Sequence, residues 1–254
     1  MDKIKIGSQL YTYRNLLKTA EDIDAVFGRI ASYGCTVAQW SGVKVAIDPK
    51  EVKRIGDEHG IEVALSHTPF DRIVGDTDRV AEEHLLMGAH TVGLGMMASE
   101  YSSSYDKLME FIDIVNEVSI KLKPYGLKFG YHNHAKEFKK MGDKLIIEHL
   151  RDGSDMEFIF DTFWCRYAGH NPSEWLENLS GRVTDIHLKD WKWAPFKLPR
   201  FQDIGKGKLD FVDILSSAEK AGTKYAYIEH DLTSDPDKTT RESMEYLQEI
   251  YYNK

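Results

Sequence analysis

Strand-like and helix-like segments alternate along the whole sequence, and this alternation limits the possible folds more than any other feature. Eight apolar segments of strand length are each followed by a segment with helical periodicity. The pair recurs at intervals of about 30 residues, the length of a strand–helix–strand unit. Such alternation predicts a parallel sheet, and eight units in 254 residues predict a single α/β domain over residues 1–254, a (β/α)8 TIM barrel.

The predicted elements have recognisable boundaries. We expect strands at residues 4–10, 36–40, 62–66, 91–95, 157–161, 183–188 and 225–229, and a fifth strand from Lys128 that carries Gly130, His132 and His134 on one face. Helices are expected to begin at N-cap residues, namely Thr19, Asp48, Asp143, Asn171 and Asp235. A doubly wound open sheet is the alternative, but the first strand ends in Tyr11-Thr12-Tyr13-Arg14 rather than in a glycine-rich turn.

Composition argues against several classes of protein. The content of 42% hydrophobic and 29% charged residues is typical of globular proteins rather than disordered ones. No apolar run approaches the roughly 18 residues of a membrane span, and no signal-peptide pattern precedes the first strand. A formal charge of -8 argues against nucleic acid as a partner. With Cys35 and Cys165 as the only cysteines, we expect no disulfide framework and a cytoplasmic setting.

Chemically active side chains gather at the predicted strand ends. TIM-barrel active sites lie on the face where the carboxyl ends of the strands open. Seven of the eight ends carry an aromatic, imidazole or carboxylate group: Tyr11, Trp40, His67, His132 with His134 and Glu137, Asp161, His187 with Lys189, and Glu229 with His230. Apolar strands have no structural need to end in this way, so we expect the active site at this rim.

Three carboxylates and one imidazole at the rim predict a metal site. Glu137, Asp161 and Glu229 would raise one another's pKa unless a cation lay between them. With His187 they offer three oxygen donors and one nitrogen donor, which suits Mn²⁺, with Mg²⁺, Co²⁺ or Zn²⁺ as alternatives. Each also has a structural interpretation: Asp161 as a helix cap, His187 as a core residue, Glu229 in an ion pair, and Glu137 in solvent.

Five ordered motifs resemble a known superfamily. They are Tyr131-His132-Asn133-His134, Phe160-Asp161-Thr162-Phe163-Trp164, Asp185-Ile186-His187-Leu188-Lys189-Asp190, the segment Ile204–Phe211, and Tyr227-Ile228-Glu229-His230-Asp231. Together they resemble the xylose-isomerase-like TIM barrels, which include sugar isomerases and epimerases, inosose dehydratases and type IV apurinic endonucleases. The resemblance spans essentially the whole chain. It implies that Asp161, His187 and Glu229 are metal ligands.

The chain departs from two branches of this superfamily. Ketose 3-epimerases carry a metal-binding Glu on strand five, where this sequence has His132, and Glu137 falls nearer their second, substrate-contacting Glu. Either Glu137 or a histidine is therefore the strand-five ligand, and histidine-rich strand-five ends also occur in the inosose-dehydratase branch. The endonucleases use further zinc ligands where this chain has Trp164 and Pro199-Arg200-Phe201, so DNA repair is not expected.

The expected activity is metal-dependent proton abstraction next to the carbonyl of a small sugar or cyclitol, through an enediolate. Glu229 or Glu137 would be the base, with His132, His134 or Lys189 as its acid partner. Return of the proton gives a sugar isomerase or epimerase, our first expectation. Loss of a leaving group gives a lyase or dehydratase acting on an inosose or 3-keto-glycoside. A non-catalytic sugar-binding barrel, or a subunit of a complex, is the remote alternative.

A long segment after strand seven is expected to bind substrate. Residues 189–209 contain Trp191, which with Tyr11, Trp40 and Trp164 would stack on a sugar, while His67 and His134 would contact it. The alternative is an aromatic packing or dimer loop, hence a possible homo-oligomer. Gly205-Lys206-Gly207-Lys208 occupies the place where barrels often bind phosphate, but we interpret it as a tight turn before the helix cap Asp210.

Overall fold

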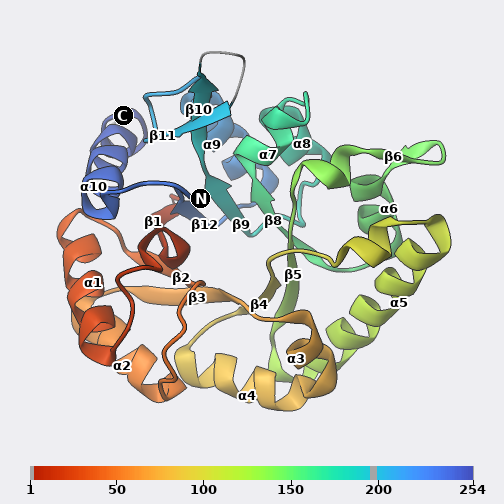
Figure 1. Cartoon of the computed structure of the whole chain (residues 1–254), viewed down its shortest axis with the longest axis horizontal. Helices are drawn as coiled ribbons and strands as arrows, with labels where there is room; N and C mark the ends of the chain where they lie inside the picture. Colours follow the sequence, from red (N-terminus) through yellow and green to blue (C-terminus); the bar gives the residue numbers. More distant parts are fainter. Residues whose placement is uncertain (1–2, 195–198, 254) are drawn as a thin grey trace.

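Eight parallel strands close into a barrel, as predicted. The computed structural model describes residues 3–194 and 199–253. Neighbours around the barrel follow the order β1-β12-β9-β8-β5-β4-β3-β2, and β2 pairs with β1 to close it (Figure 1). The barrel strands are β1 (Lys5–Gln9), β2 (Val37–Trp40), β3 (Glu62–His67), β4 (Thr91–Leu94), β5 (Lys128–His132), β8 (Glu157–Asp161), β9 (Asp185–Leu188) and β12 (Tyr225–Ile228).

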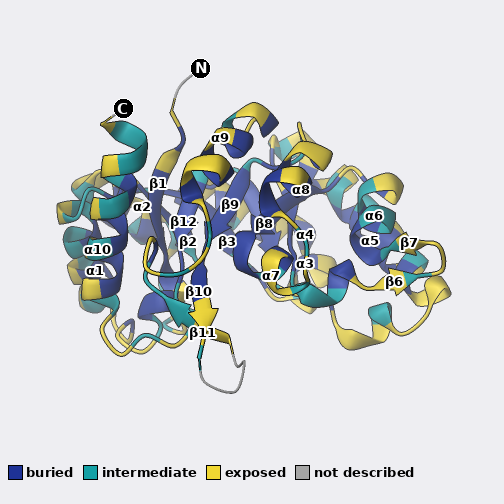
Figure 2. Cartoon of the chain, turned by 90° about the horizontal axis from the view of Figure 1, so that it is seen from above, coloured by how far each residue is buried: buried dark blue, intermediate teal, exposed yellow. Residues whose placement is uncertain are grey.

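Helices surround the barrel and bury one face each against it (Figure 2). They are α1 (Ala20–Ser32), α2 (Pro49–His59), α3 (Phe70–Gly75), α4 (Thr77–Met87), α5 (Tyr105–Leu122), α6 (Ile146–Gly153), α7 (Thr162–Tyr167), α8 (Pro172–Asn178), α9 (Phe211–Ala221) and α10 (Pro236–Leu247). The side chain of Thr19 accepts from the amide of Asp22, whose carboxylate accepts from the amide of Thr19, a reciprocal cap that starts α1. Asp48, Asn171 and Asp235 cap α2, α8 and α10, as expected.

Two local predictions need correction. Asp143 does not start a helix; it lies in the turn of a short hairpin, β6 (Lys140–Met141) with β7 (Lys144–Leu145), and α6 begins at Ile146. There the carboxylate of Glu148 accepts the amide of Leu145, which fixes the helix start. Strand five ends at His132 rather than at His134. The final helix, expected to reach about Tyr251, does so: α10 continues past Leu247 as a π-helical segment over Gln248–Tyr252.

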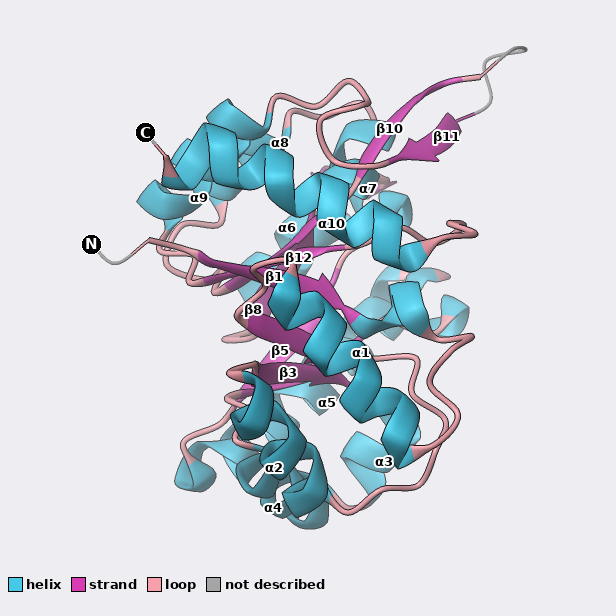
Figure 3. Ribbon diagram, turned by 90° about the vertical axis from the view of Figure 1, so that its left-hand side faces the viewer, coloured by secondary structure: helices cyan, strands magenta, loops and turns pink. Residues whose placement is uncertain are grey.

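The segment expected to be a structureless loop forms a hairpin. Antiparallel strands β10 (Asp190–Trp193) and β11 (Pro199–Gln202) pair Trp191 with Phe201. The hairpin projects from the barrel (Figure 3). Pro195 and Phe196, part of the predicted aromatic loop, lie outside the described residues. Helices α3 and α7 were not expected either, and each is only six residues long.

Strand register determines which side chains enter the barrel. Every second residue faces inward, so Ile159 in the middle of β8 is followed by Asp161 at its end. Tyr227 on β12 pairs with His187 on β9, which pairs with Asp161. Val37, Leu65, Ile159 and Tyr227, with Ala64, form a separate buried cluster. Gly7 admits a close neighbour, because a Cβ there would lie only 1.6 Å from the Val37 carbonyl oxygen.

No helix in the described ranges is long and apolar enough to cross a membrane.

Candidate metal centre

Four buried side chains meet at the carboxyl ends of neighbouring strands. His132 ends β5, Asp161 ends β8, His187 lies on β9, and Glu229 follows β12. Each offers one donor atom, and these atoms all lie within 4.8 Å of one another. Nδ1 of His187 is 2.8 Å from Oε2 of Glu229, and Nε2 of His132 is 3.3 Å from Oδ2 of Asp161. Four donors from four strands therefore converge on one buried point.

Backbone and side-chain acceptors fix the protonation of both histidines. The Nδ1–H group of His132 donates to the carbonyl of Gly95 at 3.0 Å. The Nε2–H group of His187 donates to Oε1 of Gln39 at 2.5 Å. In the neutral form of each ring the other nitrogen therefore has the lone pair, and that nitrogen is the one facing the shared point.

The two carboxylates are held in the same way. Oδ1 of Asp161 accepts the backbone amide of Trp164 at 2.9 Å, and Oε1 of Glu229 accepts from Nε2 of Gln9 at 3.4 Å. Oε2 of Glu229 and Nδ1 of His187 lie 2.8 Å apart with no hydrogen bond between them, and the Lys189 ammonium, 3.1 Å from Oε2, is the cation beside this pair. Two acceptors facing each other in a buried site are stabilised by a cation between them.

The donor set fits a first-row transition metal. Two imidazole nitrogens and two carboxylate oxygens replace the expected set of three oxygens and one nitrogen. The second nitrogen favours Mn²⁺, Co²⁺ or Zn²⁺ over Mg²⁺, which prefers oxygen ligands.

The structure does not place Glu137 with the other three expected ligands. It lies in a short 3₁₀ helix (Ala135–Phe138), fully buried, where Oε1 accepts the Tyr131 hydroxyl at 2.5 Å and Oε2 accepts the His134 amide at 2.7 Å. Burial raises its pKa. Both oxygens are thus occupied in holding the loop after β5, and His132 is the strand-five residue that lies with the other candidate donors, the other possibility that the sequence left open.

Lys189 places an ammonium beside the donors. The side chain is 2% exposed, and its Nζ lies 3.3 Å from Oδ2 of Asp161, 3.1 Å from Oε2 of Glu229 and 3.2 Å from the carboxylate of Asp231. Burial alone would lower the pKa of Lys189, but the three carboxylates raise it above its ordinary value. The group therefore stays positively charged at neutral pH.

Two further histidines border the centre. The His67 ring lies 5.3 Å from that of His132 and 5.7 Å from that of His187, while the His134 ring lies 4.6 Å from that of His132. Burial, followed by the nearby imidazoles, lowers the pKa of His67 well below its usual value, and burial lowers the pKa of His134 to about 3. Both are neutral at pH 7. Nε2 of His67 and Nδ1 of His134 have no partner in the described part of the chain.

The aromatic residues expected to stack on substrate do not gather at one place: Trp164 lies beside the donors, and the others lie elsewhere. The Trp164 ring lies between His134, at 5.2 Å, and the Lys189 ammonium, at 5.8 Å. Trp40 and His67 both line a cavity of about 370 Å³. Tyr11 is exposed and stacks on the Arg14 guanidinium at 4.1 Å. Trp191 is instead buried in the hairpin base, with its ring 4.6 Å from that of Trp193.

The Gly205–Lys208 turn is closed by an internal anion. The buried carboxylate of Asp190 accepts the backbone amides of Gly205, Gly207, Lys208 and Leu209 at 2.8–3.2 Å. These amides would have to be free to hold a phosphate. The interpretation as a tight turn is therefore confirmed, and Asp210 caps α9.

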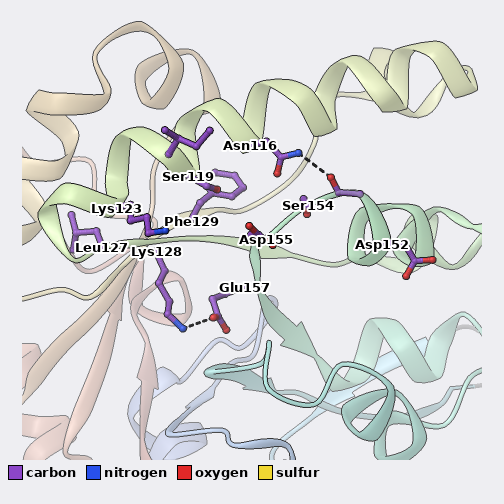
Figure 4. Close-up of a pocket in the computed structure, with 12 residues that line it drawn as sticks. Asn116, Ser119, Lys123, Leu127, Lys128, Phe129, Asp152, Ser154, Asp155 and Glu157 are labelled. Carbon is purple, nitrogen blue, oxygen red and sulfur yellow. Dashed lines mark hydrogen bonds and ion pairs between the residues drawn. The ribbon is translucent and has the colours of Figure 1, made fainter.

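A larger cavity lies at the other end of the barrel. It has a volume of about 500 Å³ and is lined by α5 and by the first residues of β5 and β8, where Lys128 pairs with Glu157 (Figure 4). His132 and Asp161 are at the opposite ends of the same strands. The amino-terminal face of such barrels serves stability rather than catalysis.

Sequence reasoning missed four residues of the site. Gln9 and Gln39 are register partners on β1 and β2 and orient Glu229 and His187. Asp231 contacts Lys189, and the Phe201 ring lies 5.7 Å from the same ammonium. Gln9 and Gln39 could have been found in the sequence, because each is a polar residue at an inward-facing position of an apolar strand. Asp231 was signalled by its position two residues after Glu229.

Comparison with known proteins identifies the family of this chain. A family described as xylose isomerase-like TIM barrel matches residues 27–250. The chain belongs to this family. Among curated relatives, an inosose dehydratase from Geobacillus kaustophilus is 26% identical over 133 residues, 46% of this chain and 41% of the relative. This chain therefore matches less than half the length of that relative.

Solved structures share the fold. A sugar phosphate isomerase/epimerase from Parabacteroides distasonis superposes with a TM-score of 0.81 at 23% identity, covering 100% of this chain and 96% of the other. A D-psicose 3-epimerase gives a TM-score of 0.72 at 9% identity, with 97% and 99% covered. The named relative is a dehydratase and the two solved structures are an isomerase/epimerase and an epimerase; at these identities the solved structures show a shared fold.

Proposed function

We propose that this protein is a divalent-metal-dependent enzyme that removes a proton from the carbon next to the carbonyl of a small sugar or cyclitol. The observation that carries the proposal is the convergence of four donor atoms, each turned toward one point by an outer hydrogen bond. A divalent ion held there, Mn²⁺ being our first choice, would supply positive charge to the carbonyl oxygen as the proton leaves.

The residues around the donors can perform the proton transfers. Glu229 is the carboxylate base at the centre, and His134, neutral and with an unpartnered Nδ1, is placed to accept a hydrogen bond from the substrate. Lys189 keeps its charge because its pKa is raised, and it is therefore placed to stabilise negative charge on a substrate oxygen. Glu137 acts indirectly, because its carboxylate holds the backbone of His134 in place.

Isomerisation or epimerisation is the first outcome of this chemistry. The proton is removed and returned to the same substrate, so substrate and product have equal mass. Support comes from the fold shared with a sugar phosphate isomerase/epimerase and with D-psicose 3-epimerase.

Elimination is the second outcome, and one observation favours it. The donor from strand five is His132, and Glu137 is turned away, so the site lacks a second free carboxylate opposite Glu229 among its described residues. Lys189 is placed to stabilise the negative charge of a leaving group instead. The similarity to an inosose dehydratase supports the same outcome.

Keto-sugars, inososes and 3-keto-glycosides incubated with the Mn²⁺-loaded protein in ²H₂O would separate these outcomes. An isomerase or epimerase gives a product isomeric with the substrate and carrying deuterium. A lyase gives a product that has lost water or an aglycone. If the protein binds the sugars without exchange or conversion, the enzyme proposal fails and a sugar-binding barrel takes its place.

A further inference from the structure

The ammonium of Lys189 shares its partners with the metal donors. Its two contacts at the centre are Oδ2 of Asp161 and Oε2 of Glu229, at 3.3 and 3.1 Å. The same oxygens lie 3.3 Å from Nε2 of His132 and 2.8 Å from Nδ1 of His187. A cation held by the four donors and the ammonium of Lys189 therefore draw on the same two oxygens.

Asp231 offers the lysine a partner outside the donor set. Nζ of Lys189 donates to Oδ2 of Asp231 at 3.2 Å, and Oδ1 is also within 3.2 Å. The rings of Trp164 and Phe201 lie 5.8 and 5.7 Å from the same Nζ, a distance at which aromatic faces stabilise a positive charge. Asp231 and the two rings can thus stabilise the Lys189 ammonium when another cation binds the donor oxygens.

The donor carboxylates, Asp231 and Lys189 together carry a net charge of two negative units. Asp161, Glu229 and Asp231 contribute three negative charges and Lys189 one positive charge, so two negative charges remain when the histidines are neutral. A divalent ion cancels this remainder. Without Asp231 the remainder falls to one, and without Lys189 it rises to three.

From this arrangement we infer that Lys189 and Asp231 together set the affinity of the centre for its divalent ion. Lys189 opposes the ion by competing for Asp161 and Glu229, and Asp231 offsets that competition by holding the ammonium. Both are positioning residues in this role. The inference rests on the proposed metal centre and adds residues that are not among its donors.

Titration with Mn²⁺, followed by the magnetic-resonance signal of the free ion, tests the inference without any substrate. Four proteins are compared at one pH and ionic strength: the unaltered protein, Asp231→Asn, Lys189→Met and the double variant. We expect Asp231→Asn to weaken Mn²⁺ binding and Lys189→Met to tighten it. Each dissociation constant should change about tenfold, as an equilibrium constant does when one charge interaction of the size of one pKa unit is removed. The double variant should bind nearly as the unaltered protein does.

Asp203→Asn is the matched control. Asp203 pairs with Lys206 at 3.2 Å on the surface after β11, so its loss changes the net charge equally without touching Lys189. It should leave Mn²⁺ affinity unchanged. Circular dichroism checks that each variant is folded.

Two results would overturn the inference alone: a Lys189→Met variant that binds Mn²⁺ no more tightly than the unaltered protein, or a double variant as weak as Asp231→Asn. The second result would mean that Asp231 acts on the fold and not through Lys189. If the unaltered protein binds no Mn²⁺, the proposed metal centre fails together with this inference.

Discussion

Asp161 uses its two carboxylate oxygens for two different tasks. Oδ1 accepts the Trp164 amide at the start of α7, and Oδ2 faces the donor cluster. The local role as a helix cap and the role as a donor, which the sequence offered as alternatives, are thus compatible in one side chain.

The substitution Asp161→Asn separates these tasks. The amide keeps an oxygen for the cap but loses the negative charge at the centre, so we expect an unchanged far-ultraviolet spectrum. Metal affinity should fall by more than about 100-fold, beyond the range seen when only an outer partner is lost. Metal content after gel filtration measures this. A variant that keeps a stoichiometric ion and full activity would remove Asp161 from the centre.

Glu137 is expected to act on stability and orientation rather than as a ligand. Glu137→Ala removes the acceptor for the buried Tyr131 hydroxyl and for the partly buried His134 amide. We expect a loss of about 1–3 kcal/mol in the free energy of unfolding and reduced turnover, with Mn²⁺ affinity nearly unchanged. Tyr131→Phe, which removes only one of the two donors, is the matched control with a smaller loss. Abolished Mn²⁺ binding in Glu137→Ala would restore Glu137 to the ligand set.

At the scale of elements, Asp190 joins the hairpin to the turn that precedes α9. It begins β10, and its carboxylate accepts four amides of the Gly205–Leu209 segment. An anion supplied by the chain itself therefore shapes a loop whose sequence resembles a ligand-binding turn. The hairpin in turn carries Phe201 to the ammonium of Lys189.

Asp190→Asn should destabilise this junction. The substituted amide presents N–H groups to backbone donors that have no other described acceptor, so we expect a loss of about 1–3 kcal/mol in denaturant unfolding. Asp203→Asn, which breaks a partly exposed ion pair nearby, should cost less than about 1 kcal/mol. Equal losses of unfolding free energy in the two variants would show that the contacts of Asp190 with the four amides stabilise the protein no more than the exposed ion pair does.

At the scale of the whole molecule, stability depends on histidines that are buried in the neutral form. His84 on α4 donates from Nδ1 to the Val80 carbonyl and accepts the Ser66 hydroxyl at Nε2, which joins the helix to β3. Burial lowers its pKa from 6.5 to about 4. The unfolded chain therefore binds more protons than the folded one between these values, and stability falls as pH drops through that window.

Replacing His84 by Gln should flatten this dependence. One group with a pKa displaced from 6.5 to about 4 accounts for about 3 kcal/mol between pH 7 and pH 4. We expect the unfolding free energy of His84→Gln to fall less on acidification than that of the unaltered protein by about that amount. Urea titrations at several pH values measure the difference, and parallel curves would contradict it.

Much of this protein was predictable from local sequence patterns. Apolar periodicity located all eight barrel strands, and caps such as Thr19 and Asp48 marked helix starts, because these signals depend on residues only a few positions apart. Asp143 failed as a cap because a hairpin, whose pairing spans β6 and β7, competed for the same residues.

The sequence by itself determined the order of the eight barrel strands and the chemical groups at each strand end, since both follow from short-range periodicity and chain order. Only the tertiary structure decided that His132 and not Glu137 joins the donors, and that Lys189 meets Asp231. Those outcomes depend on barrel register, on the turn after β5 and on charges brought together from distant strands, none of which a local pattern records.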